Sequence, residues 1–352
     1  MTSKYNGVVR AGVVQAAPVW LDLEGTLDKT ISLTEEAARN GAKLLAFPEV
    51  WFTGYPHFVW TKSNSAWPER YWRPYFENSF EADSPTMRRL QETAKANAIS
   101  LVIGFSERDG GSLYISQAVI DETGELLGVR RKFKPTHAER TVFGEGDGSD
   151  FRVFNMSYGT LGALSCFEHV QPLIKYTMNG LGEMIHVASW PAVSRPDVFS
   201  MGAEIQDTIS RMYALENQCF VLSSSQVIDQ AGQDLMAETT EERKYLHLGG
   251  GVARIYAPDG RDLADHLPID TDGIIFADLD LSEIVKMKNA LDQLGHYSKP
   301  NIFHLQVNNS KLRQLTFTRA SESARADVEG AIPADSTLPF DHQWTPPEEV
   351  TK

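Results

Sequence analysis

Three side chains that could act together in catalysis, those of Glu49, Lys132 and Cys166, each follow a segment that reads as a buried β-strand. In α/β sheets, the groups that bind ligands gather at the carboxyl ends of the strands. A thiol can attack an electrophilic carbon, a carboxylate can take its proton, and an ammonium can stabilise developing negative charge. Placement at strand ends does not by itself show that the three side chains meet.

The chain has two cysteines, Cys166 and Cys219, and only Cys166 stands at a strand-to-helix junction. Such a junction can direct helix N–H groups at the sulfur, which would lower the pKa of the thiol. Cys219 lies within an apolar strand and reads as a core residue. A cysteine beside apolar residues is most often a small core side chain, so that alternative also stands for Cys166.

Glu49 and Lys132 each allow two interpretations. Partial burial would raise the pKa of Glu49 toward neutrality, where a carboxylate is an efficient general base. Glu49 could equally be a paired structural anion. Lys132 belongs to a basic run in which Arg130 and Lys134 are expected at a solvated edge. Strand alternation alone does not single out Lys132 from that run.

Strands and helices alternate along most of the chain, which predicts an α/β fold. Strands are expected over residues 8–16, 44–47, 99–105, 113–120, 126–133, 161–165, 184–188, 219–222, 252–256 and 274–279. Helices are expected over 27–38, from Ser84-Pro85, over 170–179 and over 201–216, the last with Ile205, Ile209, Met212 and Leu215 on one face. The strand–helix–strand unit that ends at Glu49 is echoed by one that ends at Trp190-Pro191. Residues 1–306 form the expected domain, and residues 307–352 form a C-terminal tail.

The stretch from Trp51 to Trp72 contains eight aromatic residues and fits no helical or strand period. It predicts a loop with aromatic packing directly after Glu49. Two interpretations remain open: a loop held by a local aromatic cluster, or one wall of an apolar substrate pocket.

Composition narrows the classes of partner and location. The net charge of −14 disfavours binding to nucleic acid or to anionic membrane surfaces and suits a neutral substrate. No CxxC spacing suggests zinc, the N-terminus has no apolar signal segment, and no run approaches the length of a membrane span. A reducing cytoplasm is the expected location, where a reactive thiol stays free.

Four sequence blocks, spread from about Val8 to about Val307, resemble the nitrilase superfamily of carbon–nitrogen hydrolases, and in particular its true nitrilases that act on arylacetonitriles. The blocks are Leu-Leu-Ala-Phe-Pro-Glu49, Arg-Arg-Lys132-Phe-Lys-Pro-Thr-His137-Ala-Glu139-Arg140, Gly-Ala-Leu-Ser-Cys166-Phe167-Glu168-His169-Val-Gln-Pro with His186-Val-Ala-Ser-Trp190-Pro downstream, and Gly295-His-Tyr-Ser-Lys-Pro300. One departure is that Phe167 stands where this branch usually has tryptophan.

The resemblance implies a four-layer α-β-β-α sandwich built as a homodimer, which true nitrilases often stack into spirals or filaments with help from the tail. It implies Glu49, Lys132 and Cys166 as the catalytic triad, with Glu139 as a second glutamate that holds the lysine. The expected substrate-binding residues are Tyr55, His137, Phe167, Glu168 and Trp190. No metal or organic cofactor is expected.

The activity that the resemblance implies is hydrolysis of an organic nitrile to a carboxylic acid and ammonia through a thioimidate on Cys166, with some amide as by-product. Phe167 leaves the substrate preference and the acid-to-amide ratio open. Three alternatives remain: a cyanide hydratase or dihydratase of the same fold, a papain-like hydrolase that pairs Cys166 with His137 or His169, and a scaffold without catalytic activity.

Overall fold

The computed structural model describes residues 5–62, 69–192 and 202–312. The chain forms two compact units, Met1–Lys311 and Leu312–Lys352. The second unit lies outside the described residues apart from Leu312. The expected domain boundary after residue 306 and the assembly role of the tail therefore stay predictions.

The strands of the first unit form one twelve-stranded sheet in two parts that join at β1. One part has the order β5 (Leu126–Arg131), β4 (Ser112–Ile120), β3 (Ser100–Asp109), β2 (Leu44–Ala46) and β1 (Val8–Ala16), with β12 (Gly273–Asp280) also on β1 and β6 (Phe143–Gly144) on β4. The other part has the order β10 (Phe220–Gln226), β9 (Ile185–Trp190), β8 (Gly159–Ser165) and β7 (Phe154–Met156), with β11 (Arg254–Tyr256) on β10. The two parts connect where Gln15 and Ala16 pair with Ser225 and Gln226.

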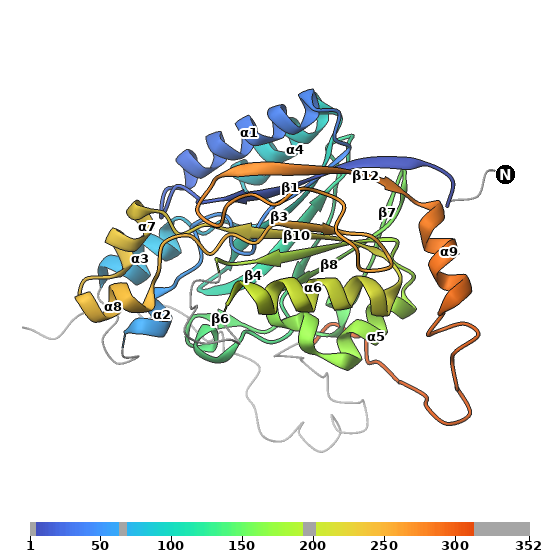
Figure 1. The fold of residues 1–352 in the computed structure, drawn as a ribbon. Coiled ribbons are helices and arrows are strands. Elements are labelled where there is room, and N and C mark those ends of the chain that lie inside the picture. Colours follow the sequence, from blue (N-terminus) through green and yellow to red (C-terminus); the bar gives the residue numbers. More distant parts are fainter. Residues whose placement is uncertain (1–4, 63–68, 193–201, 313–352) are drawn as a thin grey trace, which may run out of the picture. The chain divides into compact units, whose positions relative to one another are not determined.

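Alternate residues of each strand pack on opposite faces and produce four layers. Val13 of β1 packs with Val187 and Leu222 in a core between the two parts of the sheet. Val14, its neighbour in β1, faces the helices α1 (Leu23–Arg39) and α4 (Pro85–Asn97). Leu164 of β8 packs on the opposite side against α5 (Pro172–Gly180) and α6 (Ala203–Asn217). Figure 1 shows this order of helices, sheet, sheet and helices, which confirms the predicted α-β-β-α sandwich.

Two strand–helix–strand units provide the strand ends at which two of the catalytic residues, Glu49 and Cys166, were expected. β1 and β2 pair in parallel across α1, and β8 and β9 pair in parallel across α5. Glu49 follows the first unit, and Cys166 follows the first strand of the second. The expected strands β4 and β5 pair as an antiparallel hairpin, and α4 begins at the expected Ser84-Pro85, where the Ser84 side chain accepts the N–H of Met87.

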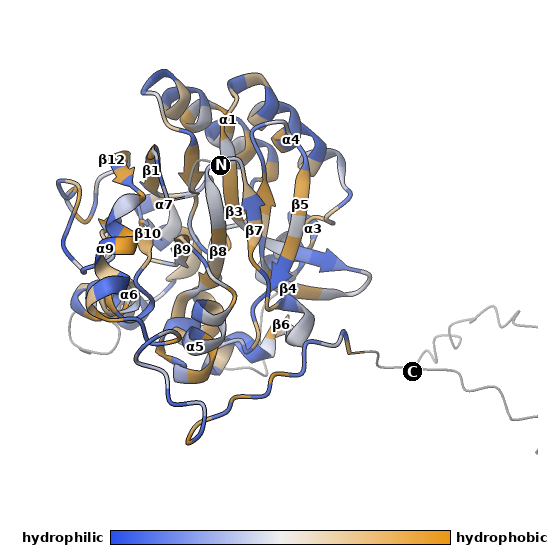
Figure 2. Cartoon of the chain, turned by 90° about the vertical axis from the view of Figure 1, so that its right-hand side faces the viewer, coloured by the Kyte–Doolittle hydropathy of each residue, from blue (hydrophilic) through white to orange (hydrophobic). Residues whose placement is uncertain are grey.

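The apolar residues that the sequence places on one face of α6 are not its most buried ones, although Ile209 packs against the core. Met212 is 41% exposed, whereas Gln206, Ser210, Tyr213 and Asn217 point inward and are buried. Hydrophobic periodicity detects only apolar faces, so it cannot identify a buried face made largely of polar residues. In Figure 2 the outer turns of α1 and α4 are mostly hydrophilic, and the hydrophobic colour concentrates on the strands, which lie between the two helical layers.

The aromatic stretch after Glu49 is only partly a loop. It contains the short helix α2 (Phe58–Thr61), and α3 (Glu69–Glu77) begins within it, while Trp67 lies outside the described residues. Tyr55, Phe58 and Tyr71 belong to one buried cluster, so the expected aromatic packing is confirmed.

The described residues of this unit also form α7 (Gln230–Met236), α8 (Thr240–Tyr245) and α9 (Ser282–Ala290). Within the described ranges, no helix is both long enough and apolar enough to cross a membrane.

Candidate active site

Three of the four expected catalytic side chains form one buried ionic cluster. The Lys132 ammonium, just beyond β5, donates to Glu49 Oε1 at 2.7 Å and to Glu139 Oε2 at 2.8 Å. All three side chains are at most 1% exposed. The structure therefore brings together residues that lie 83 and 7 positions apart in the sequence.

Cys166, the fourth residue, follows β8 directly and begins a short 3-10 helix, Cys166–Val170. Its side chain is buried, and the charges of Glu49, Lys132 and Glu139 all act on its thiol. The thiol thus lies in the electrostatic field of the ionic cluster. This placement distinguishes Cys166 from Cys219, which is packed in the core at the start of β10.

Each of the three catalytic segments contains a non-glycine residue in the left-handed region of the backbone. The φ angles are 46° at Val50, 45° at His137 and 47° at Cys166. A β-branched residue such as valine rarely adopts this conformation, and such strain is found preferentially at functional sites. The sharp turns direct the side chains out of the strand ends.

Close packing fixes the loop that carries Glu49. A Cβ atom on Gly104 would lie 2.1 Å from the carbonyl oxygen of Pro48, so only glycine allows β3 to approach this closely. On the other side, Gln226 Nε2 donates to the carbonyl oxygens of Glu49 and Val50 at 2.6 and 3.0 Å. Gln226 was not among the expected site residues; the sequence signal that could have indicated it is the polar run Ser223-Ser224-Ser225-Gln226 at the end of an apolar strand.

The environment of Glu49 suits a general base. Burial raises the pKa of Glu49 from 4.5 to about 8, against the opposing effect of Lys132 and with a further rise from Glu139. The expected rise toward neutrality is therefore confirmed. Glu49 Oε2 is buried and has no hydrogen-bond partner among the described residues, so this oxygen is available to accept a proton.

The pKa of the Cys166 thiol is raised, not lowered. Burial and the charge of Glu49 hold the pKa of Cys166 well above its ordinary value, and the hydrogen bond from the Phe167 N–H lowers it too little to compensate. The expected lowering by a backbone N–H is present, but burial and the carboxylates outweigh it, so the net shift of this pKa is upward. The resting thiol is protonated, and its proton has to leave as the sulfur attacks.

The pKa of Lys132 also departs from its ordinary value. Burial alone would lower the pKa of Lys132, but Glu139 and Glu49 raise it well above the ordinary value. The side chain is consequently an ammonium at neutral pH and keeps its three donors.

Glu139 anchors that ammonium from the far side. Its Oε1 accepts the Tyr55 hydroxyl at 2.7 Å, and its Oε2 accepts the Thr136 N–H at 2.6 Å. Trp60 Nε1 in turn donates to the Tyr55 hydroxyl oxygen at 3.0 Å. These contacts orient Glu139 toward Lys132.

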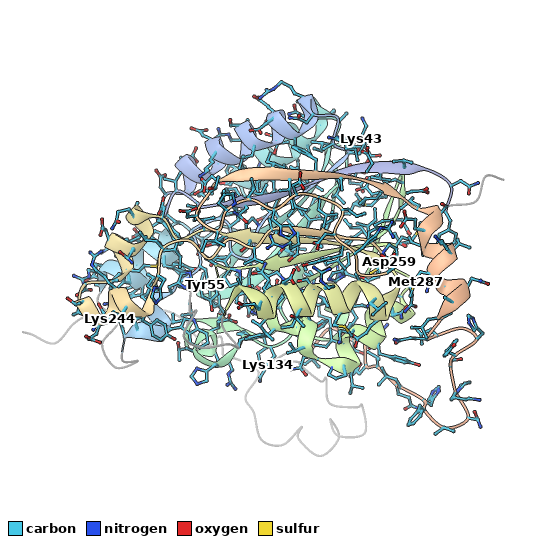
Figure 3. The ribbon with its side chains drawn as sticks, in the orientation of Figure 1. Lys43, Tyr55, Lys134, Lys244, Asp259 and Met287 are labelled. Atoms are coloured by element: carbon cyan, nitrogen blue, oxygen red, sulfur yellow. The ribbon has the colours of Figure 1, made fainter. Side chains whose placement is uncertain are left out.

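Arg130 is buried, and its expected place at a solvated edge is wrong. Its guanidinium donates two parallel hydrogen bonds to the carboxylate of Glu168, at 2.8 and 2.7 Å, and its side chain is 1% exposed. Lys134, whose side chain is 59% exposed, matches the expectation and is labelled at the molecular surface in Figure 3. Because β5 ends at Arg131, Lys134 lies beyond the strand, and alternation does not place it on the face of Arg130.

Glu168 links the lysine segment to the cysteine segment. Its Oε1 accepts the N–H of Phe133, next to the lysine, and its Oε2 accepts the N–H of Ser165, next to the nucleophile. Both oxygens are thus engaged by the chain itself. These contacts make Glu168 a positioning residue, and its expected contact with substrate stays a prediction.

Comparison with known proteins places these features in a family. The carbon-nitrogen hydrolase family model matches residues 10–289. An aliphatic nitrilase of Rhodococcus rhodochrous is 48% identical over 307 residues, which cover 87% of this chain and 84% of the relative. The chain belongs to the carbon–nitrogen hydrolase family. It falls in the nitrilase branch, since an arylacetonitrilase of Aspergillus kawachii is also 45% identical over 91% of this chain and 98% of the relative.

Solved structures show the same fold. A carbon-nitrogen hydrolase from Helicobacter pylori G27 aligns with a TM-score of 0.66 at 21% identity, over 81% of this chain and 94% of that one.

In this carbon–nitrogen hydrolase, a cavity of about 540 Å³ lies beside Phe167, the residue that follows Cys166, although none of the four predicted catalytic side chains is among its lining residues in the described part of the chain. It brings together His137, Phe167 and Glu168, three of the residues expected to bind substrate. Trp190 is buried beside it, with its ring edge-on to Phe167 at 6.2 Å between centroids. Tyr55 instead lies behind Glu139, as its hydrogen bond shows.

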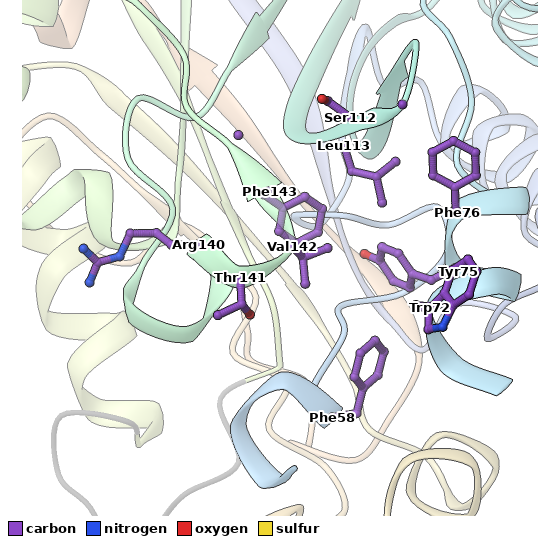
Figure 4. Close-up of a pocket in the computed structure, with 12 residues that line it drawn as sticks. Phe58, Trp72, Tyr75, Phe76, Ser112, Leu113, Arg140, Thr141, Val142 and Phe143 are labelled. Carbon is purple, nitrogen blue, oxygen red and sulfur yellow. The ribbon is translucent and has the colours of Figure 1, made fainter. Parts of the chain in front are cut away.

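A second cavity, of about 380 Å³, is lined by part of the aromatic stretch. Phe58, Trp72 and Tyr75 form one side and Arg140 and Phe143 the other, as Figure 4 shows. Of the predicted catalytic residues, none is among its lining residues in the described part of the chain. That the aromatic stretch forms one wall of a substrate pocket stays a prediction.

Two other features bear on the chemistry. The ring of His169 contacts the backbone oxygen of Cys166 at 2.6 Å, and His137 stacks on Trp60 at 5.4 Å between centroids. Neither geometry gives the thiol a histidine base, which argues against the papain-like alternative. Among the described side chains, no group of three or more His, Cys, Asp or Glu residues could hold a metal ion.

Proposed function

We propose that this nitrilase-branch hydrolase converts organic nitriles, arylacetonitriles or other aryl and alkyl nitriles, to carboxylic acids and ammonia. The observation that carries the proposal is the contact of one buried ammonium, Lys132, with two carboxylates that act on the thiol of Cys166. The printed names of the relatives, an aliphatic nitrilase and an arylacetonitrilase, support the substrate class.

The first step forms a covalent bond between Cys166 and the nitrile carbon. The free oxygen of Glu49 takes the thiol proton as the sulfur attacks, because the thiolate is too costly to form in advance beside two carboxylates. The nitrogen gains the proton and the product is a thioimidate. Lys132 stabilises the negative charge that develops on nitrogen, an effect of several kcal/mol in a buried site of low dielectric constant.

Two water molecules complete the reaction. Glu49 accepts a proton from the first water, which adds to the thioimidate carbon and gives a tetrahedral intermediate. Departure of ammonia leaves a thioester on Cys166. The second water, activated in the same way, cleaves the thioester to the carboxylic acid and restores the thiol.

The tetrahedral intermediate can also break in the other direction. If the C–S bond breaks before the C–N bond, the thiol leaves and the product is the amide. Phe167 neighbours the sulfur and packs edge-on against Trp190, so we propose that it influences this partition.

The test is an assay of purified protein with phenylacetonitrile, mandelonitrile, an aliphatic nitrile and cyanide, in which ammonia and the carbon product are followed separately. Ammonia and acid from an organic nitrile, lost in Cys166→Ala and retained in Cys219→Ala, are the expected result. Cyanide turnover alone would assign the chain to the cyanide hydratases or dihydratases. A wild-type protein that turns over none of the four substrates would contradict the proposal.

We further propose a homodimer that assembles into a spiral or filament, with residues 307–352 contributing. Exposed apolar side chains support this: Leu173 on α5 is 66% exposed, and Phe303, ahead of the tail, is 74% exposed. Sedimentation of the full chain and of a chain that ends at Lys311 tests the role of the tail, and equal sizes would contradict it. We also propose a cytoplasmic location, which two free, buried cysteines support.

A further inference from the structure

A chain of buried polar contacts leads away from the backbone of Cys166. The Nδ1 of His169 lies 2.6 Å from the carbonyl oxygen of Cys166, and its Nε2 lies 2.9 Å from the Nε2 of His186. The Nδ1 of His186 lies 2.7 Å from Oε2 of Glu183. The three side chains are at most 3% exposed, and the steps of the proposed reaction use none of them.

Donor and acceptor chemistry fixes the direction of these hydrogen bonds. A carbonyl oxygen only accepts, so the Nδ1 of His169 carries a proton and donates it to Cys166. Burial and the neighbouring His186 hold the pKa of His169 well below its ordinary value, so its ring is neutral and its Nε2 is an acceptor. The Nε2 of His186 therefore donates to His169. The N–H groups of these two hydrogen bonds, from His186 to His169 and from His169 to the Cys166 carbonyl, both point toward Cys166.

The far end of the chain is anchored on α6. Glu183 Oε1 accepts the Tyr213 hydroxyl at 2.6 Å and the Asn217 amide at 3.1 Å. A Cβ atom on Gly162 would lie 1.9 Å from Glu183 Oε2, so the strand that leads to the nucleophile has a glycine where the carboxylate passes. These contacts account for two of the inward-facing polar residues of α6, Tyr213 and Asn217, which the hydrophobic pattern of the sequence does not explain.

Aromatic packing holds both imidazole rings in place. The His169 ring stacks on Trp190 with 5.6 Å between centroids and 23° between planes. The centroids of the Tyr213 and His186 rings are 4.0 Å apart. Neither imidazole can rotate freely, and connected hydrogen bonds in a low-dielectric interior strengthen one another.

We propose that His169, His186 and Glu183 are positioning residues for the nucleophile: they fix the Cys166 carbonyl, and thereby the left-handed turn that directs the thiol at the substrate. Cys166 has a φ of 47°, which is strained for a residue with a side chain. A hydrogen bond to its carbonyl restrains the rotation of the next peptide unit. The thiol then keeps one direction relative to Glu49 and Lys132. The kinetic part of this inference rests on the proposed nitrilase activity.

The test compares two substitutions of one residue. His169→Phe keeps an aromatic ring and removes both hydrogen bonds. It is expected to lower kcat about 10- to 100-fold with little change in KM, because misplacing a reacting atom by about 1 Å has that effect. His169→Asn retains an N–H that can reach the Cys166 carbonyl but not His186. Its kcat is expected to fall between those of the wild type and His169→Phe.

A second readout does not depend on nitrile turnover. The rate at which iodoacetamide alkylates Cys166, measured by peptide mass spectrometry with Cys219 as internal reference, should fall in the same order. Thr30→Val, which removes a buried hydrogen bond to Trp51 Nε1, controls for lost stability and should leave both readouts at the wild-type level. Failure of the proposed function alone would abolish turnover in the wild type but keep this order of alkylation rates.

Three results would overturn the inference: wild-type kcat and alkylation in folded His169→Phe, wild-type values in His169→Asn, or equal values in the two variants. If His169→Phe does not fold, His169→Asn decides the matter. A lower kcat and slower alkylation in folded His169→Asn support the positioning role, and unchanged values contradict it.

Discussion

Lys132 occupies one oxygen of Glu49 and leaves the other without a partner among the described residues. The two oxygens of this carboxylate consequently have different roles. Oε1 is anchored by the ammonium, which fixes the plane of the group, and Oε2 remains a proton acceptor. Because Glu139 binds the same ammonium, the cluster carries a net charge of −1 with both glutamates ionised, and the thiol keeps its proton until attack.

The pH dependence of kcat/KM should follow the ionisation of Glu49. The base accepts a proton only as a carboxylate, so activity should rise with pH through about 8, the pKa of Glu49. Glu139→Gln removes a charge that raises this pKa. The acid limb should therefore move to lower pH by about one unit, while kcat falls because Lys132 loses a partner. Glu145→Gln, which alters an exposed pair with Lys134, is the matched control, and an unmoved acid limb in Glu139→Gln would count against Glu49 as the base.

Stability should depend on pH at the same residue. The folded-state pKa of Glu49, about 8, lies above the ordinary value of 4.5, so the folded protein holds a proton that the unfolded chain releases between these values. The contribution of Glu49 is fully present below 4.5, falls as the pH rises and is completely lost above about 8. Gln imitates the protonated form at every pH. The urea midpoint of Glu49→Gln minus that of the wild type should thus increase from about pH 5 to about pH 8 and then level off, and a flat difference would contradict the raised pKa.

Loss of the Arg130–Glu168 pair should be costly in both stability and activity. Glu168→Gln leaves a buried guanidinium without its anion, which lowers the free energy of unfolding by about 3–5 kcal/mol. The cysteine and lysine segments also lose their shared carboxylate, so kcat should fall in whatever protein remains folded. Lys134→Ala, in the same basic run but exposed, should change stability by less than about 0.5 kcal/mol in chemical denaturation. Equal effects of the two substitutions would show that the buried pair has no special role.

Phe167 offers a test of substrate class. Phe167→Ala removes an aromatic side chain from the lining of the cavity of about 540 Å³. It should lower kcat/KM for phenylacetonitrile at least about tenfold, since losing apolar contact with a substrate is worth about 1–3 kcal/mol. The loss for a short aliphatic nitrile should be smaller. Equal losses for both substrates would mean that Phe167 does not contact the aryl group.

The sequence predicted much of the scaffold because the strands have local signatures. The continuous apolar runs before Glu49 and Cys166 identified two strand ends, and Ser84-Pro85 identified a helix start that the structure confirms. These features depend on residues next to one another in the chain. The four layers came from resemblance to the family, since no periodicity specifies how two parts of a sheet stack.

What the sequence did not predict depends on partners that are distant in the chain. Arg130 reads as a surface cation until Glu168, 38 positions later, is placed against it. The pKa of the Cys166 thiol is raised rather than lowered. Burial and the charge of Glu49, which follows a different strand, outweigh the effect of the backbone N–H. The inward-facing polar residues of α6 are explained by distant partners: Tyr213 and Asn217 bond to Glu183, and Ser210 contacts Ser223.

The most direct test of the central claim is mass spectrometry of the enzyme quenched during turnover of phenylacetonitrile. The account predicts an acyl adduct, the phenylacetyl group joined as a thioester, on the peptide that contains Cys166 and not on the peptide that contains Cys219. The adduct should be absent in Cys166→Ala and should form far more slowly in Glu49→Gln. Turnover without any adduct on Cys166, or an adduct that forms equally fast without the Glu49 carboxylate, would contradict the assignment of nucleophile and base.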